Sequence, residues 1–290
     1  MHHANHFYGH AAIMARYCGY KVDPPRIRGF LQHGWNIIDG FAPGMPYVPG
    51  VPRFLWSSGP VRRGLPNGHR NGYAIGAPWL YLLDQKPDPG GPRRGTIWYP
   101  FHGWEQQEVL GDHSALIAEI RETEPEDVTV CLYWAEYENP AVRRLYERVG
   151  FRVICHGYRG HWWNRTDPDF LYRQLAELRR HRRVASNRLS SAIFYGIAAG
   201  CEPAVYGDPM VLTDEHPVFG GVARIRRLWP ELHGHQIDLA TARQIADHEL
   251  GAAFLAHPAE IRELFHWRPH PPTTTWADRP PLEMACPTST

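Results

Sequence analysis

The residues best suited to chemistry lie in residues 182–209, RRVASNRLSSAIFYGIAAGCEPAVYGDP. A short apolar segment runs into Ser186 and Asn187, and Ser190 and Ser191 then open an apolar helix. Unpaired amides at a helix N-terminus, together with serine hydroxyls, bind anions such as phosphate. Serine at this position also caps a helix without any ligand. Four small polar residues at one junction favour the phosphate-binding interpretation.

Two histidine loops form a second candidate group. GFLQHGW (29–35) and TIWYPFHGW (96–104) each run an apolar segment into His-Gly-Trp. An imidazole titrates near neutral pH, so His33 is able to move a proton. Gly103 lets a ligand approach the backbone closely. A purely structural turn explains His102 equally well, and a shared tripeptide also arises by chance.

Alternating strands and helices position these loops. Apolar runs and helix-end signals predict strands at 96–100, 128–134, 151–155, 183–185 and 203–206, and helices at 112–123, 139–149, 167–180 and 190–199. This alternation predicts a parallel α/β sheet. Ligands bind beyond the carboxyl ends of the strands in such sheets, where both His-Gly-Trp loops are expected.

The flanking regions are less regular. Before residue 90 we expect a helix at 7–20, strands at 27–31 and 53–58, and a third strand within 73–83 that ends near Gly76. Residues 84–95 are charged and rich in Pro and Gly, which predicts a linker. Helices are expected at 238–255 and 258–267, before a Pro/Thr-rich tail. We therefore divide the chain into 1–90, 91–235 and 236–290.

Composition excludes several classes of function. The chain has 290 residues, 43% of them hydrophobic, and a net charge of +1, which gives no overall attraction to nucleic acid or to an anionic membrane. Five dispersed cysteines without CxxC spacing predict buried thiols in a reducing compartment. No apolar run approaches the roughly 20 residues of a membrane span. We expect a cytoplasmic protein without a metal site, since the N-terminal MHHANH offers too few ligands.

Together these motifs resemble a known group of enzymes. SNRLSSAIFYGIAAGCEPAVYGDP resembles the serine-rich region of CDP-glycerol polyol-phosphate transferases and the Ser-Ser motif of bacterial sialyl- and polysialyltransferases. FRVICHGYR (151–159) resembles the strand leading to their His-Pro motif, although Gly157 replaces the proline, and Asn187 stands where the polyol-phosphate enzymes have Asp. The resemblance covers residues 26–210. It implies a GT-B fold, with two Rossmann-like domains facing across a cleft and parallel sheets with flanking helices.

The resemblance also implies a function. The chain would transfer a sugar from a nucleotide-sugar donor to a hydroxyl of a carbohydrate or natural-product acceptor, with inversion, in bacterial polysaccharide or natural-product biosynthesis. Such enzymes use no metal or other cofactor. A polyol-phosphate transferase of the same fold and a non-catalytic nucleotide- or glycan-binding protein are the alternatives. Neither nucleic acid nor a transmembrane segment is expected.

The resemblance assigns roles to individual residues. His33 is the expected general base, and His10 in YGHAAIMA is its rival. Asp208 either contacts the sugar or ribose, or caps a turn. Trp35 and Trp104 are expected beside the ligand, with burial in the core as the alternative. The remaining expected contacts to the donor and its phosphates are His102, Gly103, His156, Arg159, Ser186, Asn187, Ser190 and Ser191.

Overall fold

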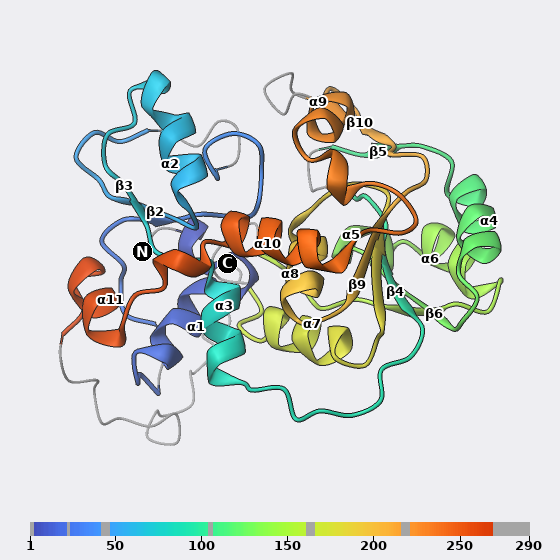
Figure 1. Cartoon of the computed structure of the whole chain (residues 1–290), viewed down its shortest axis with the longest axis horizontal. Coiled ribbons are helices and arrows are strands. Elements are labelled where there is room, and N and C mark those ends of the chain that lie inside the picture. The colour runs from blue at the N-terminus through green and yellow to red at the C-terminus, as the bar shows by residue number, and fades with distance from the viewer. Residues whose placement is uncertain are drawn as a thin grey trace, which may run out of the picture.

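The computed structural model describes residues 3–21, 24–41, 47–103, 107–160, 166–215 and 221–268. These residues form two main parallel β-sheets with helices packed against them (Figure 1). The predicted α/β class, with parallel sheets and flanking helices, is therefore confirmed. We call the elements before residue 90 the first lobe and those from β4 to β9 the second lobe.

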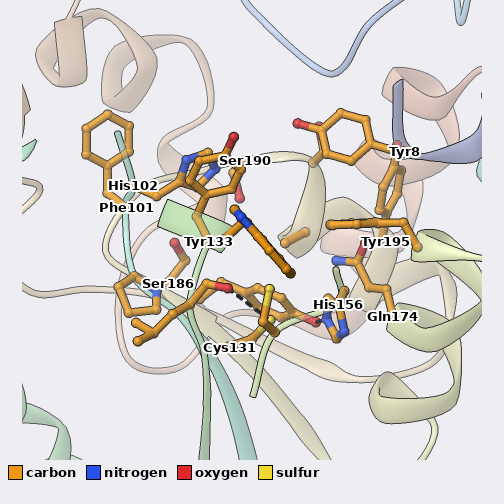
Figure 2. Close-up of a pocket in the computed structure, with 18 of the residues that line it drawn as sticks. Tyr8, Phe101, His102, Cys131, Tyr133, His156, Gln174, Ser186, Ser190 and Tyr195 are labelled. Atoms are coloured by element: carbon orange, nitrogen blue, oxygen red, sulfur yellow. Dashed lines mark hydrogen bonds between the residues drawn. The ribbon is translucent and has the colours of Figure 1, made fainter. Parts of the chain in front are cut away.

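The second lobe is built on a five-stranded sheet in the order β7-β6-β4-β8-β9, with every neighbouring pair parallel. The strand bounds are β4 (Thr96–Tyr99), β6 (Val128–Cys131), β7 (Arg152–Ile154), β8 (Arg183–Ser186) and β9 (Glu202–Val205). From β4 the chain moves outward to β6 and β7, then crosses to β8 on the other side. The order reverses between β4 and β8, which is the topological switch point of a doubly wound sheet. A cavity lies at this point (Figure 2).

Helices cover this sheet: α4 (His113–Thr123), α5 (Trp134–Glu138), α6 (Pro140–Glu147), α7 (Phe170–Leu178) and α8 (Ser191–Ala198). Their ends carry the expected signals. The Asp112 carboxylate accepts hydrogen bonds from the first amides of α4, and Asn139 caps α6 ahead of a proline at its first position. The structure differs from the sequence prediction here: helix α5, which includes Trp134, was not predicted, and α7 begins only at Phe170.

The first lobe has a three-stranded parallel sheet in the order β1-β2-β3. Its elements are η1 (His3–Gly9), α1 (His10–Tyr17), β1 (Phe30–Leu31), β2 (Arg53–Leu55), α2 (Ser58–Gly64), η2 (Leu65–Asn67), β3 (Gly72–Ala74) and α3 (Pro78–Gln85). The predicted third strand does end before Gly76, but the rest of that apolar run is helix α3. A short apolar run does not distinguish strand from helix, and Pro78 at the first helical position was the available signal.

The described residues after β9 return to both lobes. It contains β10 (Val211–Leu212), paired antiparallel with β5 (Val109–Leu110), and then α9 (Gly221–Leu228), η5 (Pro230–Leu232), α10 (Leu239–Leu250), η6 (Ala252–Phe254) and α11 (Pro258–Leu264). Helix α10 packs on α8, whereas Phe265 after α11 lies 4.8 Å from Phe54 of β2 between ring centroids. Among the described residues, no helix is long and apolar enough to cross a membrane.

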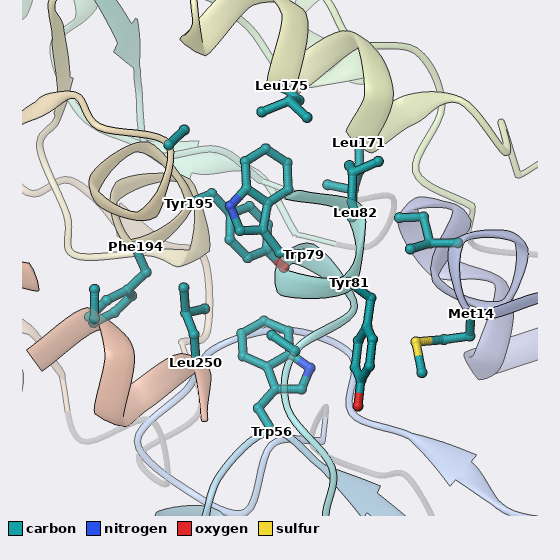
Figure 3. Close-up of a cluster of buried hydrophobic side chains, with 14 of the residues drawn as sticks. Met14, Trp56, Trp79, Tyr81, Leu82, Leu171, Leu175, Phe194, Tyr195 and Leu250 are labelled. Atoms are coloured by element: carbon teal, nitrogen blue, oxygen red, sulfur yellow. The ribbon is translucent and has the colours of Figure 1, made fainter. Parts of the chain in front are cut away.

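One hydrophobic core joins the two lobes (Figure 3). Trp79 of α3 stacks on Tyr195 of α8, with ring centroids 4.5 Å apart and planes 14° apart. Trp56, which follows β2, lies 5.9 Å from the same tyrosine ring. The division into residues 1–90, 91–235 and 236–290 stays a proposal about folding units, because buried side chains from all three segments belong to this core.

Candidate functional site

A cavity of about 190 Å³ lies beyond the carboxyl ends of the second-lobe strands (Figure 2). Loops after β4, β6, β7 and β8 form its walls, so it occupies the switch point of the sheet. Tyr8 from the first lobe and Tyr195 from α8 complete the enclosure. The walls are largely aromatic, with the rings of Tyr8, Tyr99, Phe101, Tyr133, Phe170 and Tyr195.

His156 is a neutral polar group of this cavity. Its Nε2 lies 3.0 Å from the Tyr99 hydroxyl oxygen (Figure 2), and its backbone carbonyl accepts a hydrogen bond from Arg173. Burial lowers the pKa of His156 to about 3, and the charges of Arg173 and Arg152 act in the same direction against that of Glu177. Near neutral pH this histidine therefore offers a hydrogen bond to a ligand and carries no positive charge for a phosphate.

The two serines at the start of α8 have different surroundings. Ser190 is the N-cap residue, and its side chain makes no capping hydrogen bond in the described structure although it lines the cavity. Its hydroxyl and the first amides of α8 remain available to a ligand. The Ser191 hydroxyl also borders the cavity but accepts a hydrogen bond of 2.9 Å from the Trp35 amide. Ser191 thus ties the first histidine loop to α8.

Asn187 and Asp208 hold loops together. The Asn187 side chain accepts a hydrogen bond from the Phe101 amide at 2.6 Å and donates one to the Asp208 carbonyl at 2.7 Å. The Asp208 carboxylate accepts from the Met210 amide, which is the turn-capping alternative. Neither residue is among the described residues that line the cavity, whereas Ser186 is. The Ser186 hydroxyl accepts a hydrogen bond from the Arg188 amide.

Arg188 lines the cavity and was missed by the sequence analysis. Its guanidinium donates to both carboxylate oxygens of Glu215, at 2.8 and 2.9 Å, and lies 3.7 Å above the Phe101 ring. This pairing neutralises its charge, so Arg188 shapes the cavity wall. A buried arginine cannot be recognised without its partner, and here the carboxylate lies 27 residues away.

Arg159 and Tyr133 link the two His-Gly-Trp loops beside the cavity. His33 Nε2 lies 3.4 Å from a terminal nitrogen of Arg159, and Arg159 Nε donates to the Tyr133 hydroxyl at 3.0 Å. The Tyr133 ring stacks on His102, with centroids 4.6 Å apart (Figure 2). His102 lines the cavity, whereas His33 packs behind Tyr8 at a centroid distance of 5.4 Å. The structure thus brings four predicted or missed site residues into one contact chain.

His33 is neutral in this arrangement. Burial, followed by the charge of Arg159 and the neighbouring His10 and His102, holds the pKa of His33 well below its usual value. Its Nδ1 atom is buried and has no hydrogen-bond partner among the described residues. Arginine only donates, so Nε2 is the accepting nitrogen and Nδ1 carries the hydrogen of the neutral ring; Nε2 is therefore the atom that is able to take a proton.

His10, the rival base, lies deeper. Its side chain is fully buried in α1, and burial lowers its pKa to about 3. The Gln32 carbonyl opposes this shift, but neither ring nitrogen has a hydrogen bond of good geometry within the described chain. The structure therefore places His10 behind the first loop, away from the cavity lining.

The second loop is shaped by its own backbone contacts. The Gly103 amide donates to the Glu136 carboxylate at 2.9 Å, and a Cβ on Gly103 would lie 2.4 Å from the Gln107 carbonyl oxygen. This glycine is required by neighbouring backbone, and it does not line the cavity. Trp104 lies outside the described residues. Within the described ranges no group of three or more His, Cys, Asp or Glu side chains is placed to hold a metal ion.

Comparisons with known proteins identify no family. No protein-family model and no curated protein matches the chain. Similar solved structures include a proposed UDP-N-acetylglucosamine 2-epimerase from Listeria monocytogenes (17% identity, TM-score 0.37, 74% of this chain and 55% of that chain). A second is Arabidopsis thaliana UGT89C1 complexed with UDP-L-rhamnose (12% identity, TM-score 0.30, 69% of this chain and 47% of that chain). A third is the wall teichoic acid polymerase TagF (12% identity, TM-score 0.37, 84% of this chain and 64% of that chain). The chain spans about half to two-thirds of these structures, and TM-scores this low do not assign a function.

Proposed function

We propose that the chain is a nucleotide-sugar-dependent glycosyltransferase of the GT-B type, acting in the cytoplasm in bacterial polysaccharide or natural-product biosynthesis. The observation that carries the proposal is the cavity at the switch point of the second sheet, with the N-terminus of α8 at its edge. Nucleotides bind at such points in doubly wound sheets, and phosphates bind at helix N-termini.

The cavity lining suggests which part of a donor would lie inside the cavity and which part would lie at its edge. Aromatic rings, the neutral His156 and the paired Arg188 favour a flat, uncharged part such as a base or a sugar ring. The volume of about 190 Å³ is below the roughly 300–1,000 Å³ of typical small-molecule sites. We therefore place only this part inside, and place the phosphates at the cavity edge against the Ser190 hydroxyl and the amides of α8.

His33 is the proposed general base. The acceptor hydroxyl would replace Arg159 at His33 Nε2 and donate its proton to that nitrogen, while the hydroxyl oxygen attacks the anomeric carbon and the donor phosphate leaves with the bonding electrons. Attack from the face opposite the phosphate inverts the configuration. The negative charge of a bound donor would raise the pKa of His33, because an anion opposes the effects of burial and of Arg159. Donor binding would thus make the base stronger.

The leaving phosphate is assigned to the N-terminus of α8. Its amides and the positive end of the helix dipole stabilise charge that develops as the bond to the sugar breaks. This assignment needs no resident metal or other cofactor. Arg159 and His102 remain in the proposal as groups that join His33 to the cavity wall through Tyr133.

Two alternatives use the same cavity. A polyol-phosphate donor would occupy the same serine-capped helix and would differ only in the transferred group. A non-catalytic nucleotide- or glycan-binding role is favoured by the strongly lowered pKa of His33, which makes it a weak base when the site is empty. Turnover separates this second alternative from the transferase, because binding alone would leave the donor intact.

A thermal-shift screen against CMP, CDP, UDP, GDP and dTDP tests the proposal. A nucleotide that binds the native state raises Tm, and we expect one of the five to do so. Ser190→Ala should weaken binding of that nucleotide about tenfold through loss of one hydrogen bond to a charged group. Ser114→Ala, in the first turn of α4, is the matched control. No response to any nucleotide, or full affinity in Ser190→Ala, would overturn the donor-site assignment.

Thiol labelling gives an independent measure of the same site. Cys131 and Cys155 both line the cavity, and Cys155 is the more exposed of the two. Burial raises the pKa of the Cys155 thiol, so maleimide labelling should be slow and should increase with pH. A bound nucleotide should slow it further, which mass spectrometry of the labelled peptide would measure.

A further inference from the structure

Tyr8 has a strained backbone conformation at the edge of the cavity. Its φ of 57° and ψ of 11° lie in the left-handed region, which bulky side chains rarely adopt. The other non-glycine residues with positive φ in the described ranges are Met210, Asp214 and His266, and Tyr8 is the member of this set that lines the cavity. Strained residues of this kind concentrate at binding and active sites, where surrounding contacts hold them in place.

Hydrogen bonds to both lobes hold the segment that carries Tyr8. In the first lobe, the buried Asn5 side chain donates to the Gly29 carbonyl at 2.9 Å and accepts from the Leu31 amide at 2.7 Å. In the second lobe, the Arg159 carbonyl accepts from the Tyr8 amide at 2.9 Å. Segment η1 therefore connects the two lobes at the edge of the cavity, and these two attachments set the position of Tyr8.

The residue after Tyr8 has no room for a side chain. Gly9 has a φ of 79°, and a Cβ at this position would lie 2.5 Å from the Pro168 carbonyl oxygen. Glycine lets η1 approach the segment before α7 this closely. Two consecutive left-handed residues, Tyr8 and Gly9, then lead the chain into α1. This close approach brings the Tyr8 side chain to the wall of a cavity that belongs to the other lobe.

The Tyr8 ring borders both the cavity and His33. Its centroid lies 5.4 Å from that of His33 and 5.1 Å from that of Phe170, another ring of the cavity wall. Figure 2 shows Tyr8 among the side chains around the cavity. Its hydroxyl forms no hydrogen bond with any residue in the part of the chain that the structure describes. A ring and a hydroxyl of this kind are both able to bind a ligand.

We propose that Tyr8 is a specificity-determining residue that contacts the sugar of the donor, with its ring packed on the sugar and its hydroxyl bonded to a sugar hydroxyl. This rests on the proposed function, and it assigns the sugar, rather than the base, to the cavity. A general base acts on the anomeric carbon through the acceptor, so the sugar must lie close to His33. Tyr8 is a cavity residue whose ring contacts that of His33. The phosphates stay at α8, and the base lies beyond them.

The rest of the lining favours a neutral sugar over an acidic one. His156 carries no charge near neutral pH, and the Arg188 guanidinium is already paired with both carboxylate oxygens of Glu215. A sugar carboxylate would lose its water here without gaining a charged partner, which costs free energy. Neutral hydroxyl groups, by contrast, find hydrogen-bond partners in the Tyr8 hydroxyl and in the His156 ring. The expected substrate class is therefore a nucleotide donor with an uncharged sugar.

Thermal-shift titration with matched pairs of ligands tests the proposal. Three pairs carry a neutral sugar: UDP with UDP-glucose, GDP with GDP-mannose, and dTDP with dTDP-glucose. CMP with CMP-N-acetylneuraminate adds an acidic sugar, and CDP with CDP-glycerol adds a polyol. In one of the neutral pairs, we expect the native protein to bind the conjugate more tightly than the free nucleotide, because the sugar adds contacts in the cavity.

Variants of Tyr8 then separate the sugar from the nucleotide. Tyr8→Phe keeps the ring and removes the hydroxyl, so it should bind the conjugate roughly threefold to tenfold more weakly and the free nucleotide as well as native protein does. Tyr8→Ala should bind the conjugate no more tightly than the nucleotide. Tyr73→Phe is the matched control, because Tyr73 also belongs to the first lobe, is 47% exposed and lies outside the cavity lining. It should bind both ligands normally.

Each other outcome overturns the assignment. Unchanged conjugate binding in Tyr8→Phe, or an equal loss for nucleotide and conjugate, would leave Tyr8 with a structural role only. Preferential binding of CMP-N-acetylneuraminate or CDP-glycerol would exclude a neutral sugar. A native protein that responds to no nucleotide and no conjugate would refute the donor site itself, and the role of Tyr8 with it. Failure of the Tyr8 assignment alone is distinguishable, because the native protein would still bind the free nucleotide.

Discussion

The two His-Gly-Trp loops follow parallel strands in different lobes, yet they have different surroundings. In the first, Trp35 connects the loop to helices α8 and α10. Its amide donates to Ser191, its indole donates to Glu249, and its ring packs on Phe194. In the second, His102 lines the cavity and stacks on Tyr133. A position after a parallel strand brings a loop to the site, but the helices that pack on the loop decide its role.

A fall in pH should lower the free energy of unfolding more than any single substitution in the two loops. His10 lies behind the first loop and His156 in the cavity wall near the second, each with a pKa of about 3. The unfolded chain, with histidine pKa near 6.5, binds more protons below that pH, so stability is complete above about pH 6.5 and is lost as pH falls toward 3. Each histidine contributes about 1.4 kcal/mol per pH unit in this window, and His33 acts in the same direction.

Urea unfolding between about pH 7 and pH 4 measures this slope. His10→Phe and His156→Gln should each reduce it by about 1.4 kcal/mol per pH unit. If one variant changes the slope and the other does not, the two loops differ in burial as well as in role. An unchanged slope in both would show that neither histidine is neutral in the native state.

Trp35→Ala should have the largest effect on stability of any change in the two loops. It removes the ring contacts with Phe194 and Trp229, at 4.9 and 5.0 Å, and leaves the buried Glu249 without its indole partner. We expect a loss of about 3–5 kcal/mol in the free energy of unfolding. His102→Ala, which removes a stacked ring from a cavity wall, should lose about 1 kcal/mol. If urea unfolding gave similar losses for Trp35→Ala and His102→Ala, the proposed difference between a residue that connects helices and one that lines the cavity would be wrong.

Turnover should depend more on His33 than on His102. Once the donor is identified, His33→Ala should lower kcat about 10²- to 10⁴-fold through loss of the general base. His102→Ala should mainly raise KM for the donor, because His102 lines the cavity. A large loss of kcat in His102→Ala, with near-normal turnover in His33→Ala, would exchange the roles of the two loops.

Tyr133→Phe should destabilise the protein as little as His102→Ala does. It removes the hydrogen bond from Arg159 but keeps the stack on His102, so we expect a loss of about 1 kcal/mol in stability. Tyr133→Ala removes both contacts and should destabilise further. If the two variants lose the same amount, the stacked ring does not connect the loops and the hydroxyl alone does.

Local sequence signals predicted the second lobe well. Apolar runs bounded by capping residues predicted β4, β6, β7, β8 and β9 but not the two-residue β5, and cavity residues such as His156 and Ser190 follow from the ends of the predicted strands. What sequence did not predict depends on distant partners. Ser191 meets Trp35 across 156 positions, and the orientation of Arg188 depends on Glu215. Tyr133 was missed because a tyrosine after a buried strand has no local signature of a stacked, hydrogen-bonded neighbour.

The return of the last helices to the first lobe has a consequence for biosynthesis. Phe265 packs on Phe54, Trp267 packs on Tyr20, and the Ala77 amide donates to the Leu250 carbonyl. A ribosome makes the first sheet long before it makes these partners. Domains that carry their own core fold as they emerge, from the N-terminus onward. Here Phe54 lacks its Phe265 partner until about 200 further residues have been added. We therefore expect early interruption of translation to leave an aggregation-prone fragment.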